Sequence, residues 1–566
     1  MIGPLNSTDR PLAAPHRGRR PGRPAPPVLG VALGLLAAFA LSLGAGCGQP
    51  SYGGARVPFP NRANDDGACS WTPNVCAALA EAGENRAALE SVLTHYAAAR
   101  DSAGLQAAEF LIGNMAGHAY ATFGLFDSTG TEIELDVLAY PDYDSLITAL
   151  EALEDQHGTL DFERKDIYFD LTEISAHLLI ENIDLALAAW REKPWAQHLG
   201  FAPFSQYVLP YRGSGEPLES WRPHFLDRYA GLAERMDDPD DPIEAARHIN
   251  EDLKSWFHFD PRYYLHPTDQ GLSEMLATRL GRCEDMTNLT IYAMRANGLG
   301  VTSDYTPYWA DTGNNHAWNA ILDRSGQAIV FMGAEANPGS YQLHNKAAKV
   351  YRKTFARQAE SLAMIKPDYE EVPPWLRGKN YRDVTADYQP VRDITVPLTR
   401  VVPDSVHFAY LCVFNSGEWG AIHWGRIEGG MATFDDMGTG IVYLPAYYAN
   451  GRLEPAAPPF VLEATGLARR LFPAEDQRSP LRLHATTRRR QMESTEGVQA
   501  AFFHGGATYE LFYWDHEWVS AGTRIAADGP LVFDHVPAGA LYWLVEEDSR
   551  REERIFTYES NAQVWW

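Results

Sequence analysis

The sequence predicts a multidomain α+β protein, with a helical N-terminal region, a mixed core and β-rich modules at the C-terminal end. The first observation is length, because 566 residues are too many for one compact core at about 100–200 residues per domain. The second is apolar spacing, which is helical in the first half of the chain. The third is that the last third contains short runs of β-branched and aromatic residues between Gly, Pro and Asp turns.

The N-terminal segment is typical of an export signal. Basic residues precede an apolar run at 28–43, and small residues lead from it to Cys47. The run is about 16 residues long, short for a stable membrane span. We therefore predict a signal peptide over 1–46 and a Gly- and Pro-rich tether over 47–74. An uncleaved signal anchor is the alternative.

Cys47 directly follows small residues, which resembles the lipid-attachment site of a lipoprotein. We therefore expect an exported protein, periplasmic or at the cell surface, that is held at the membrane by a lipid anchor. Its partner would be a peptide, protein or cell-envelope substrate.

Charge and motif spacing exclude several other functions. The formal net charge is −26, and we find no basic patch with interleaved aromatic residues, so we expect no nucleic-acid partner. The sequence contains no Cys-x-x-Cys or His-Glu-x-x-His spacing and no Walker-type or dinucleotide-binding loop. We therefore expect neither a metal nor another cofactor.

The changes of pattern along the chain set the predicted domains. Helical spacing at 78–99 and 174–190 predicts a helical domain over 75–240. A mixed domain over 241–365 follows, and β-rich domains are expected over 385–490 and 495–566. Within the mixed domain we expect helices over 242–257, before Gly281 and from Cys283 to about Asn297, followed by strands over 301–305, 316–322 and 327–332.

The five cysteines leave one without an obvious structural role. Cys69 and Cys76 lie seven residues apart and are candidates for a disulfide in an oxidising compartment. Cys412 lies in an apolar strand-like run and is expected to be a small buried side chain. Cys283 remains by elimination, and an unpaired cysteine in an exported protein indicates a reactive thiol. A lone cysteine is more often a buried structural residue, so its surroundings must decide.

Cys283 is expected at the N-terminus of a helix. The positive end of the helix dipole and the unpaired N–H groups there favour the thiolate, which is the nucleophilic form. The same N–H groups can stabilise a developing oxyanion. Glu284 and Asp285 follow directly and would oppose the thiolate if they faced the sulfur, so a nearby imidazolium would have to outweigh them.

His316 opens a predicted strand and can supply that imidazole. If Leu322 pairs with Gln327 across the following turn, His316 lies opposite Gly333, and Glu335 lies on the same face one diagonal step away. Glu335 is therefore the candidate that orients His316, and Asn337 is the alternative. In the loop before His316, Tyr308 and Trp309 either line a substrate groove or cap the hairpin.

Three spaced blocks carry a family resemblance: Gly-Arg-Cys-Glu-Asp at 281–285, Met-Arg-Ala-Asn-Gly-Leu-Gly at 294–300 and His-Ala-Trp-Asn at 316–319. Together they resemble the core of the transglutaminase-like superfamily, and the flanks are similar to bacterial transglutaminase-like lipoproteins. The resemblance implies a papain-like α+β core with a Cys–His–Asp triad. Cys283 and His316 match the first two members, whereas Glu335 stands where the family has Asp.

The resemblance implies an exported cysteine enzyme that forms a thioester on a carboxamide or peptide carbonyl. If water releases the acyl group from the enzyme, the protein is a peptidase or amidase. If an amine releases the acyl group, the protein cross-links its substrates. The alternative is a surface binding or scaffold protein whose transglutaminase-like core is inactive and whose C-terminal β-sandwich-like modules recognise glycan or protein.

Overall fold

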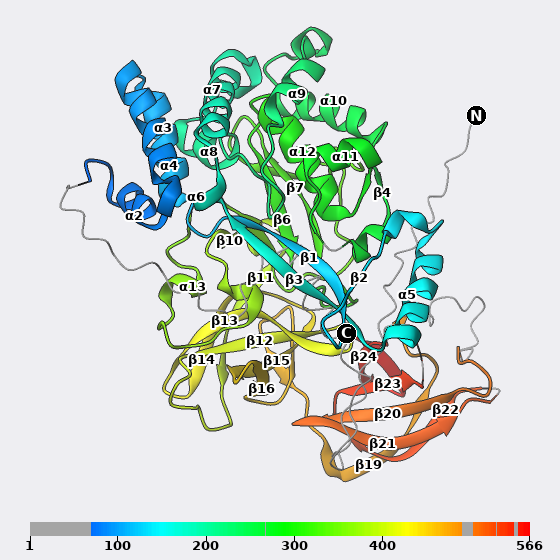
Figure 1. Cartoon of the computed structure of the whole chain (residues 1–566). Helices are drawn as coiled ribbons and strands as arrows, with labels where there is room; N and C mark the ends of the chain where they lie inside the picture. Colours follow the sequence, from blue (N-terminus) through cyan, green and yellow to red (C-terminus); the bar gives the residue numbers. More distant parts are fainter. Residues whose placement is uncertain (1–68, 267, 489–501, 528, 548, 550–552) are drawn as a thin grey trace.

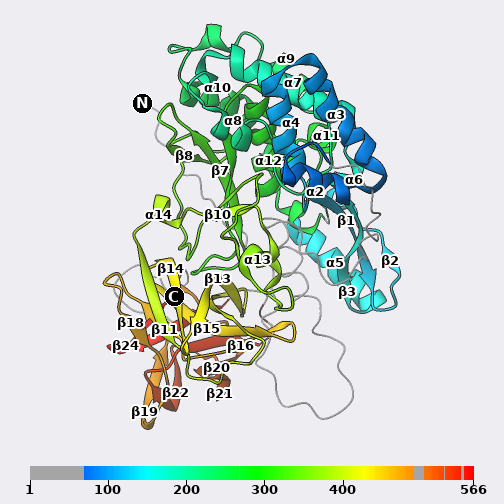
Figure 2. The ribbon, with the colours of Figure 1, turned by 90° about the vertical axis from the view of Figure 1, so that its left-hand side faces the viewer.

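The computed structural model describes residues 69–266, 268–488, 502–527, 529–547, 549 and 553–566 (Figure 1). The predicted signal peptide, Cys47 and the tether up to residue 68 lie outside this part of the chain. Among the described residues, no helix has the length and apolar character needed to span a bilayer. The helices of the N-terminal region and the core gather at one end of the molecule, and the β-rich units lie at the other (Figures 1 and 2).

Helices α2, α3, α4 and α7 form the centre of the N-terminal region and bury their apolar faces in one cluster. The helical spacing at 78–99 corresponds to α2 and α3, and that at 174–190 corresponds to α7. A disulfide joins Cys69 to Cys76 in the first turn of α2. The helices of this region are α2 (Pro73–Glu81), α3 (Arg86–Ala99), α4 (Ser102–Asn114), α5 (Tyr143–His157), α6 (Asp170–Glu173), α7 (Ala176–Glu192), α8 (Phe201–Tyr207) and α9 (Arg222–Arg228).

A three-stranded antiparallel sheet interrupts this region, so the expectation of a helical domain over 75–240 was incomplete. The strands β1 (Ala119–Asp127), β2 (Glu132–Ile133) and β3 (Leu160–Phe169) lie in the order β2-β1-β3. In β3 only Leu160 is buried. A strand without a buried face lacks the alternating apolar pattern by which strands are predicted.

The core places helix α12 against a five-stranded sheet of order β10-β9-β6-β7-β8. All residues of α12 are buried, because α9, α10, β6 and β7 contact it from several sides. The elements are α10 (Pro242–Lys254), β4 (His258–Phe259), α11 (Leu272–Thr278), β5 (Leu280–Gly281), α12 (Cys283–Ala296), β6 (Val301–Thr306), β7 (His316–Leu322), β8 (Ala328–Phe331), β9 (Tyr351–Lys353), α13 (Leu362–Ile365), β10 (Tyr381–Asp383) and α14 (Thr385–Tyr388).

The core differs from the predicted domain over 241–365 in two respects. Its sheet is completed by β10, which lies beyond residue 365. The β7–β8 hairpin also has a different register, because Leu322 pairs with Ala328 and not with Gln327. Strand β8 also ends at Phe331, so the pairing of His316 with Gly333 from which we placed Glu335 does not form.

An eight-stranded sheet follows the core, and its central strand β12 is buried on both faces. Along its central strand, Phe408, Tyr410 and Cys412 pack toward the core and the last unit, whereas Ala409 and Leu411 pack into a separate cluster. The burial of Cys412 agrees with the expected apolar role. The strands are β11 (Val391–Pro397), β12 (Phe408–Asn415), β13 (Glu418–Glu428), β14 (Met431–Gly438), β15 (Ile441–Ala449), β16 (Arg452–Pro455), β17 (Phe460–Leu462) and β18 (Ala468–Arg470).

The last unit packs a five-stranded sheet of order β21-β20-β23-β24-β25 against the β19–β22 pair. This unit starts at β19, earlier than the predicted boundary at 495, because β19 pairs with β22. The strands are β19 (Ala474–Leu483), β20 (Thr508–Asp515), β21 (Glu517–Ile525), β22 (Leu531–Ala538), β23 (Tyr542–Glu546), β24 (Ile555–Glu559) and β25 (Ala562–Trp565).

Glu553, just before β24, should make the stability of this unit depend on pH. Its side chain is buried, and burial raises the pKa of Glu553 to about 7, above the value of about 4.3 expected in the unfolded chain. The folded state therefore favours the neutral acid. The stability of the folded state should be complete below the unfolded pKa and should fall as the pH rises through the folded pKa, by about 3–4 kcal/mol in total.

The Glu553→Gln variant stays neutral, so it should unfold at about the same temperature as the wild type near pH 4.5 and at a higher temperature near pH 8. Thermal unfolding at both pH values checks this expectation. An equal difference between the two proteins at both pH values would contradict it.

Candidate active site

Cys283 is the first residue of α12, and only 6% of its surface is exposed. Arg282 before it is extended (φ −86°, ψ 179°) and forms the N-cap. The thiol therefore lies where the N–H groups of the first helical turn have no partner within the helix. This arrangement favours a thiolate and places amide donors beside it.

Asp285, one of the two acidic neighbours of Cys283, is directed back toward the N-cap. Its carboxylate accepts a hydrogen bond of 2.8 Å from the backbone N–H of Arg282 and completes a capping box. Gly281 permits this approach, because a Cβ atom there would lie 2.6 Å from the Cβ of Asp285. The charge of Asp285 therefore stabilises the start of the helix.

The second acidic neighbour, Glu284, pairs with Lys353 of β9. The Glu284 side chain is only 1% exposed, and that of Lys353 is 13% exposed. Because the ammonium group balances the carboxylate at close range, Glu284 opposes a Cys283 thiolate less than an unpaired carboxylate would.

His316 opens β7 and is half-buried. Its Nε2 lies 2.7 Å from the hydroxyl oxygen of Tyr341. The rings of Trp318 and Trp309 lie 5.6 and 6.0 Å from the His316 ring, centroid to centroid. Three aromatic side chains thus surround the imidazole and limit its movement.

Tyr341 contacts His316 and lies where the charges of Glu335 and Cys283 act on its hydroxyl. Burial raises the pKa of the Tyr341 hydroxyl, and the charges of Glu335 and Cys283 raise it further. These charges act at short range, so Cys283, Glu335 and the partner of His316 share one electrostatic environment. Sequence reasoning missed Tyr341, because it lies in an irregular segment far along the chain from His316.

A buried network supports the aromatic surroundings of His316. The Trp318 indole N–H donates to the Tyr388 hydroxyl oxygen at 2.8 Å, and the Tyr388 hydroxyl donates to Asp304 at 2.6 Å. Arg352 binds both carboxylate oxygens of Asp304 at 2.7 and 2.8 Å. Bidentate pairs of this kind are rigid, so Trp318 is held firmly beside the imidazole.

Glu335 follows a tight turn that two asparagines hold in place. The Asn319 side-chain oxygen accepts from Gly333 N–H at 3.1 Å, and that of Asn250 accepts from Ala334 N–H at 2.8 Å. Gly333 allows a close approach, because a Cβ there would lie 2.6 Å from the Asn319 side-chain oxygen. Glu335 itself is exposed. The turn brings its charge near Tyr341.

The alternative orienting residue, Asn337, is directed toward α10. Its side-chain oxygen accepts from Asn250 at 3.0 Å, and its amide donates to Glu251. The side chain is thus engaged by a helix and does not orient His316.

Tyr308 and Trp309, the two candidate substrate-binding residues, lie in different surroundings. Tyr308 packs against the eight-stranded sheet, where a Cβ at Gly420 would lie 2.9 Å from its ring. Trp309 belongs to the same apolar cluster as Cys283 and Trp318. Trp309 therefore borders the candidate site, whereas Tyr308 fastens the loop to the β-rich unit.

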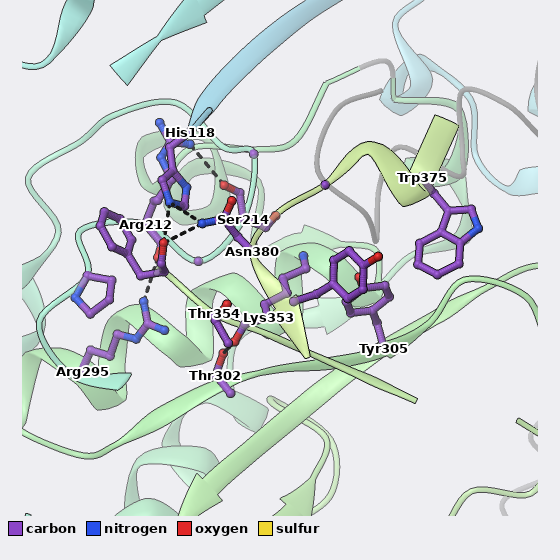
Figure 3. Close-up of a pocket in the computed structure, with 16 residues that line it drawn as sticks. His118, Arg212, Ser214, Arg295, Thr302, Tyr305, Lys353, Thr354, Trp375 and Asn380 are labelled. Atoms are coloured by element: carbon purple, nitrogen blue, oxygen red, sulfur yellow. Dashed lines mark hydrogen bonds between the residues drawn. The ribbon is translucent and has the colours of Figure 1, made fainter. Parts of the chain in front are cut away.

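A separate crevice (Figure 3) includes Arg295 near the C-terminal end of α12, and neither Cys283 nor His316 lines it. Two of its cationic side chains are engaged: Arg212 by Asp170, and Lys353 by Glu284. Because Cys283 lies at the other end of α12, the chemistry of acyl transfer is not assigned to this crevice. Within the described part of the chain, no group of three or more His, Cys, Asp or Glu side chains is arranged to hold a metal ion.

The comparisons with known proteins agree with this geometry. Residues 230–330 match a family model described as the transglutaminase-like superfamily. The matched segment contains Cys283 and His316 but ends before Glu335 and Tyr341. A comparison with curated proteins found no matching sequence.

Proposed function

We propose that this chain, whose residues 230–330 belong to the transglutaminase-like superfamily, is an exported cysteine enzyme that forms a thioester on a carboxamide or peptide carbonyl. The observation that carries the proposal is that Cys283 begins α12 in the same apolar cluster as Trp309 and Trp318. The rings of these two tryptophans lie beside the His316 ring, and the Tyr341 hydroxyl contacts His316 from another side. A thiol at a helix N-terminus and an imidazole therefore share one site.

The reaction proceeds in two stages. The Cys283 thiolate attacks the carbonyl carbon, and the backbone N–H of Cys283 donates to the oxyanion that forms. The carbon–nitrogen bond then breaks, the amine leaves with a proton from His316, and a thioester remains. Water or a second amine next attacks the thioester and gives its proton to His316, and the thiolate leaves. Water yields an acid, and an amine yields a new amide.

Tyr341 and Glu335 serve the imidazole in this scheme. The Tyr341 hydroxyl holds the His316 ring through Nε2, and the Glu335 charge acts on that hydroxyl. Glu335 would then take the place of the family's Asp as the carboxylate of the site.

We also propose that the chain is exported and anchored through Cys47. Support comes from the Cys69–Cys76 disulfide, because such bonds persist in oxidising compartments and are rare in the cytosol. The substrate would then be a peptide, protein or cell-envelope component outside the cytoplasm.

Tyr341→Phe should lower kcat about tenfold, as loss of a supporting hydrogen bond commonly does. KM should change little, because the ring and its packing remain. Steady-state kinetics check this expectation, and Tyr369→Phe is the control, since Tyr369 is 68% exposed. An unchanged kcat in Tyr341→Phe would show that Tyr341 does not hold the catalytic imidazole.

An activity screen tests the proposed function. Wild type and Cys283→Ala are incubated with glutaminyl and other peptide amides, with and without a primary amine, while ammonia and peptide products are measured. Product that depends on Cys283 supports the enzyme, and incorporation of the amine distinguishes cross-linking from hydrolysis. If no thioester can be trapped on Cys283 and no product depends on it, the binding or scaffold function stands in its place.

A further inference from the structure

The loop 307–315 joins β6 to His316, and both the core and the two β-rich units hold it. Within the core, Ala310 N–H donates to the Lys346 carbonyl at 2.8 Å, and Trp309 N–H donates to the Asn314 carbonyl at 3.1 Å. Asn314 is left-handed (φ +65°), a conformation that asparagine adopts more readily than most residues with a side chain. His316 follows it by two residues.

Asn415, at the end of β12, is the central support. Its side-chain nitrogen lies 3.0, 2.9 and 2.9 Å from the carbonyl oxygens of Trp309, Thr312 and Asn314, so its two N–H groups serve three acceptors and one hydrogen is shared. Asn415 is only 6% exposed. One buried amide of the eight-stranded sheet thus contacts three carbonyls of the loop, including that of the left-handed Asn314.

Arg554, which precedes β24 in the last unit, adds a second support. Its guanidinium donates to the Ala310 carbonyl at 2.8 Å and to the Phe414 carbonyl at 2.9 Å. Arg554 is 5% exposed. It therefore links the loop, the eight-stranded sheet and the last unit at one point.

We infer that the two β-rich units act as a clamp that positions the loop 307–315, and through it Trp309 and His316, for the reaction at Cys283. Asn415 and Arg554 are positioning residues, because they contact neither thiol nor imidazole. This role rests on the proposed function.

Buried carbonyls left without a donor are costly, so loss of Asn415 should release the loop. In full-length Asn415→Ala, amide protons of 309–316 should exchange at least about tenfold faster than in wild type. At about pH 7, Cys283 should react with iodoacetamide about five- to tenfold more slowly, because a displaced His316 no longer favours the thiolate.

Gln563→Ala is the matched control. Gln563 is also a buried amide of a β-rich unit (6% exposed), but it binds the backbone of His484 and Ala485. This variant should lose stability as Asn415→Ala does, while exchange at 309–316 and alkylation of Cys283 stay within about twofold of wild type. If Asn415→Ala is insoluble, Asn415→Ser and Arg554→Lys are measured in its place.

Equal exchange at 309–316 in the Asn415 and Gln563 variants would overturn the clamp. Faster exchange with unchanged alkylation would overturn its role in positioning His316. Failure of the proposed function would give a different result, because wild-type Cys283 would then react no faster than an ordinary thiol. Hydrogen exchange in the variants would still decide whether the clamp holds the loop.

Discussion

His316→Ala is expected to lower kcat/KM by about a thousandfold, because positioned general acid–base catalysis contributes about 10²–10⁴ in rate. The imidazole both favours the thiolate and returns the proton to the leaving amine. Neither Tyr341 nor Glu335 can replace it, since burial and two nearby charges hold the pKa of Tyr341 above its usual range and Glu335 is exposed. Turnover per folded molecule, at saturating and limiting substrate, measures the effect.

The control for this variant is His344→Ala. His344 is exposed and lies in the same irregular segment as Tyr341, so its loss should leave turnover unchanged. A His316→Ala enzyme that kept more than about a tenth of wild-type kcat/KM would mean that the imidazole is not the catalytic base.

Asp304→Ala is expected to have the largest effect on stability, about 3–5 kcal/mol, because it leaves a buried charge without its partner. Asp304 is fully buried, and Arg352, which binds it at two points, is 2% exposed. The variant also frees the Tyr388 hydroxyl that holds Trp318. Activity at temperatures where the variant remains folded should therefore fall as well.

Asp387→Ala provides a matched comparison. Asp387 lies 3.8 Å from the same guanidinium, but its side chain is 55% exposed, and exposed pairs contribute about 1 kcal/mol or less. We expect denaturant unfolding, monitored through the near-UV signal of the aromatic residues in the core, to show a large loss of stability for Asp304→Ala and a small one for Asp387→Ala. Equal losses would show that burial of the Asp304 pair is not what stabilises the core.

Local signals explain what the sequence predicted well. A glycine before Cys283, an acid at the third helical position and apolar spacing define the start of α12 without any distant contact. The strands that begin at Val301 and His316 follow in the same way from β-branched and aromatic runs. These elements carry the two residues on which the proposed chemistry depends.

Long-range contacts explain what the sequence did not predict. Strand β10 joins the core sheet through pairing with β9, and Tyr341 reaches His316 across an irregular segment. The β7–β8 register depends on whether Leu322 meets Gln327 or Ala328, which the turn residues left open. The role of Asn415 depends on the packing of the end of β12 against the loop 307–315. No sequence pattern around Asn415 indicates this contact.

The central claim is that His316 activates Cys283, and the rate of Cys283 alkylation as a function of pH tests it most directly. Wild type and His316→Ala are treated with iodoacetamide across the pH range, and the label on Cys283 is quantified by mass spectrometry. We predict that wild-type Cys283 reacts rapidly at about pH 7 and that in His316→Ala the rate rises only near the ordinary thiol pKa of about 8.5. Identical profiles for the two proteins, with Cys283 reacting as an ordinary thiol, would contradict the account.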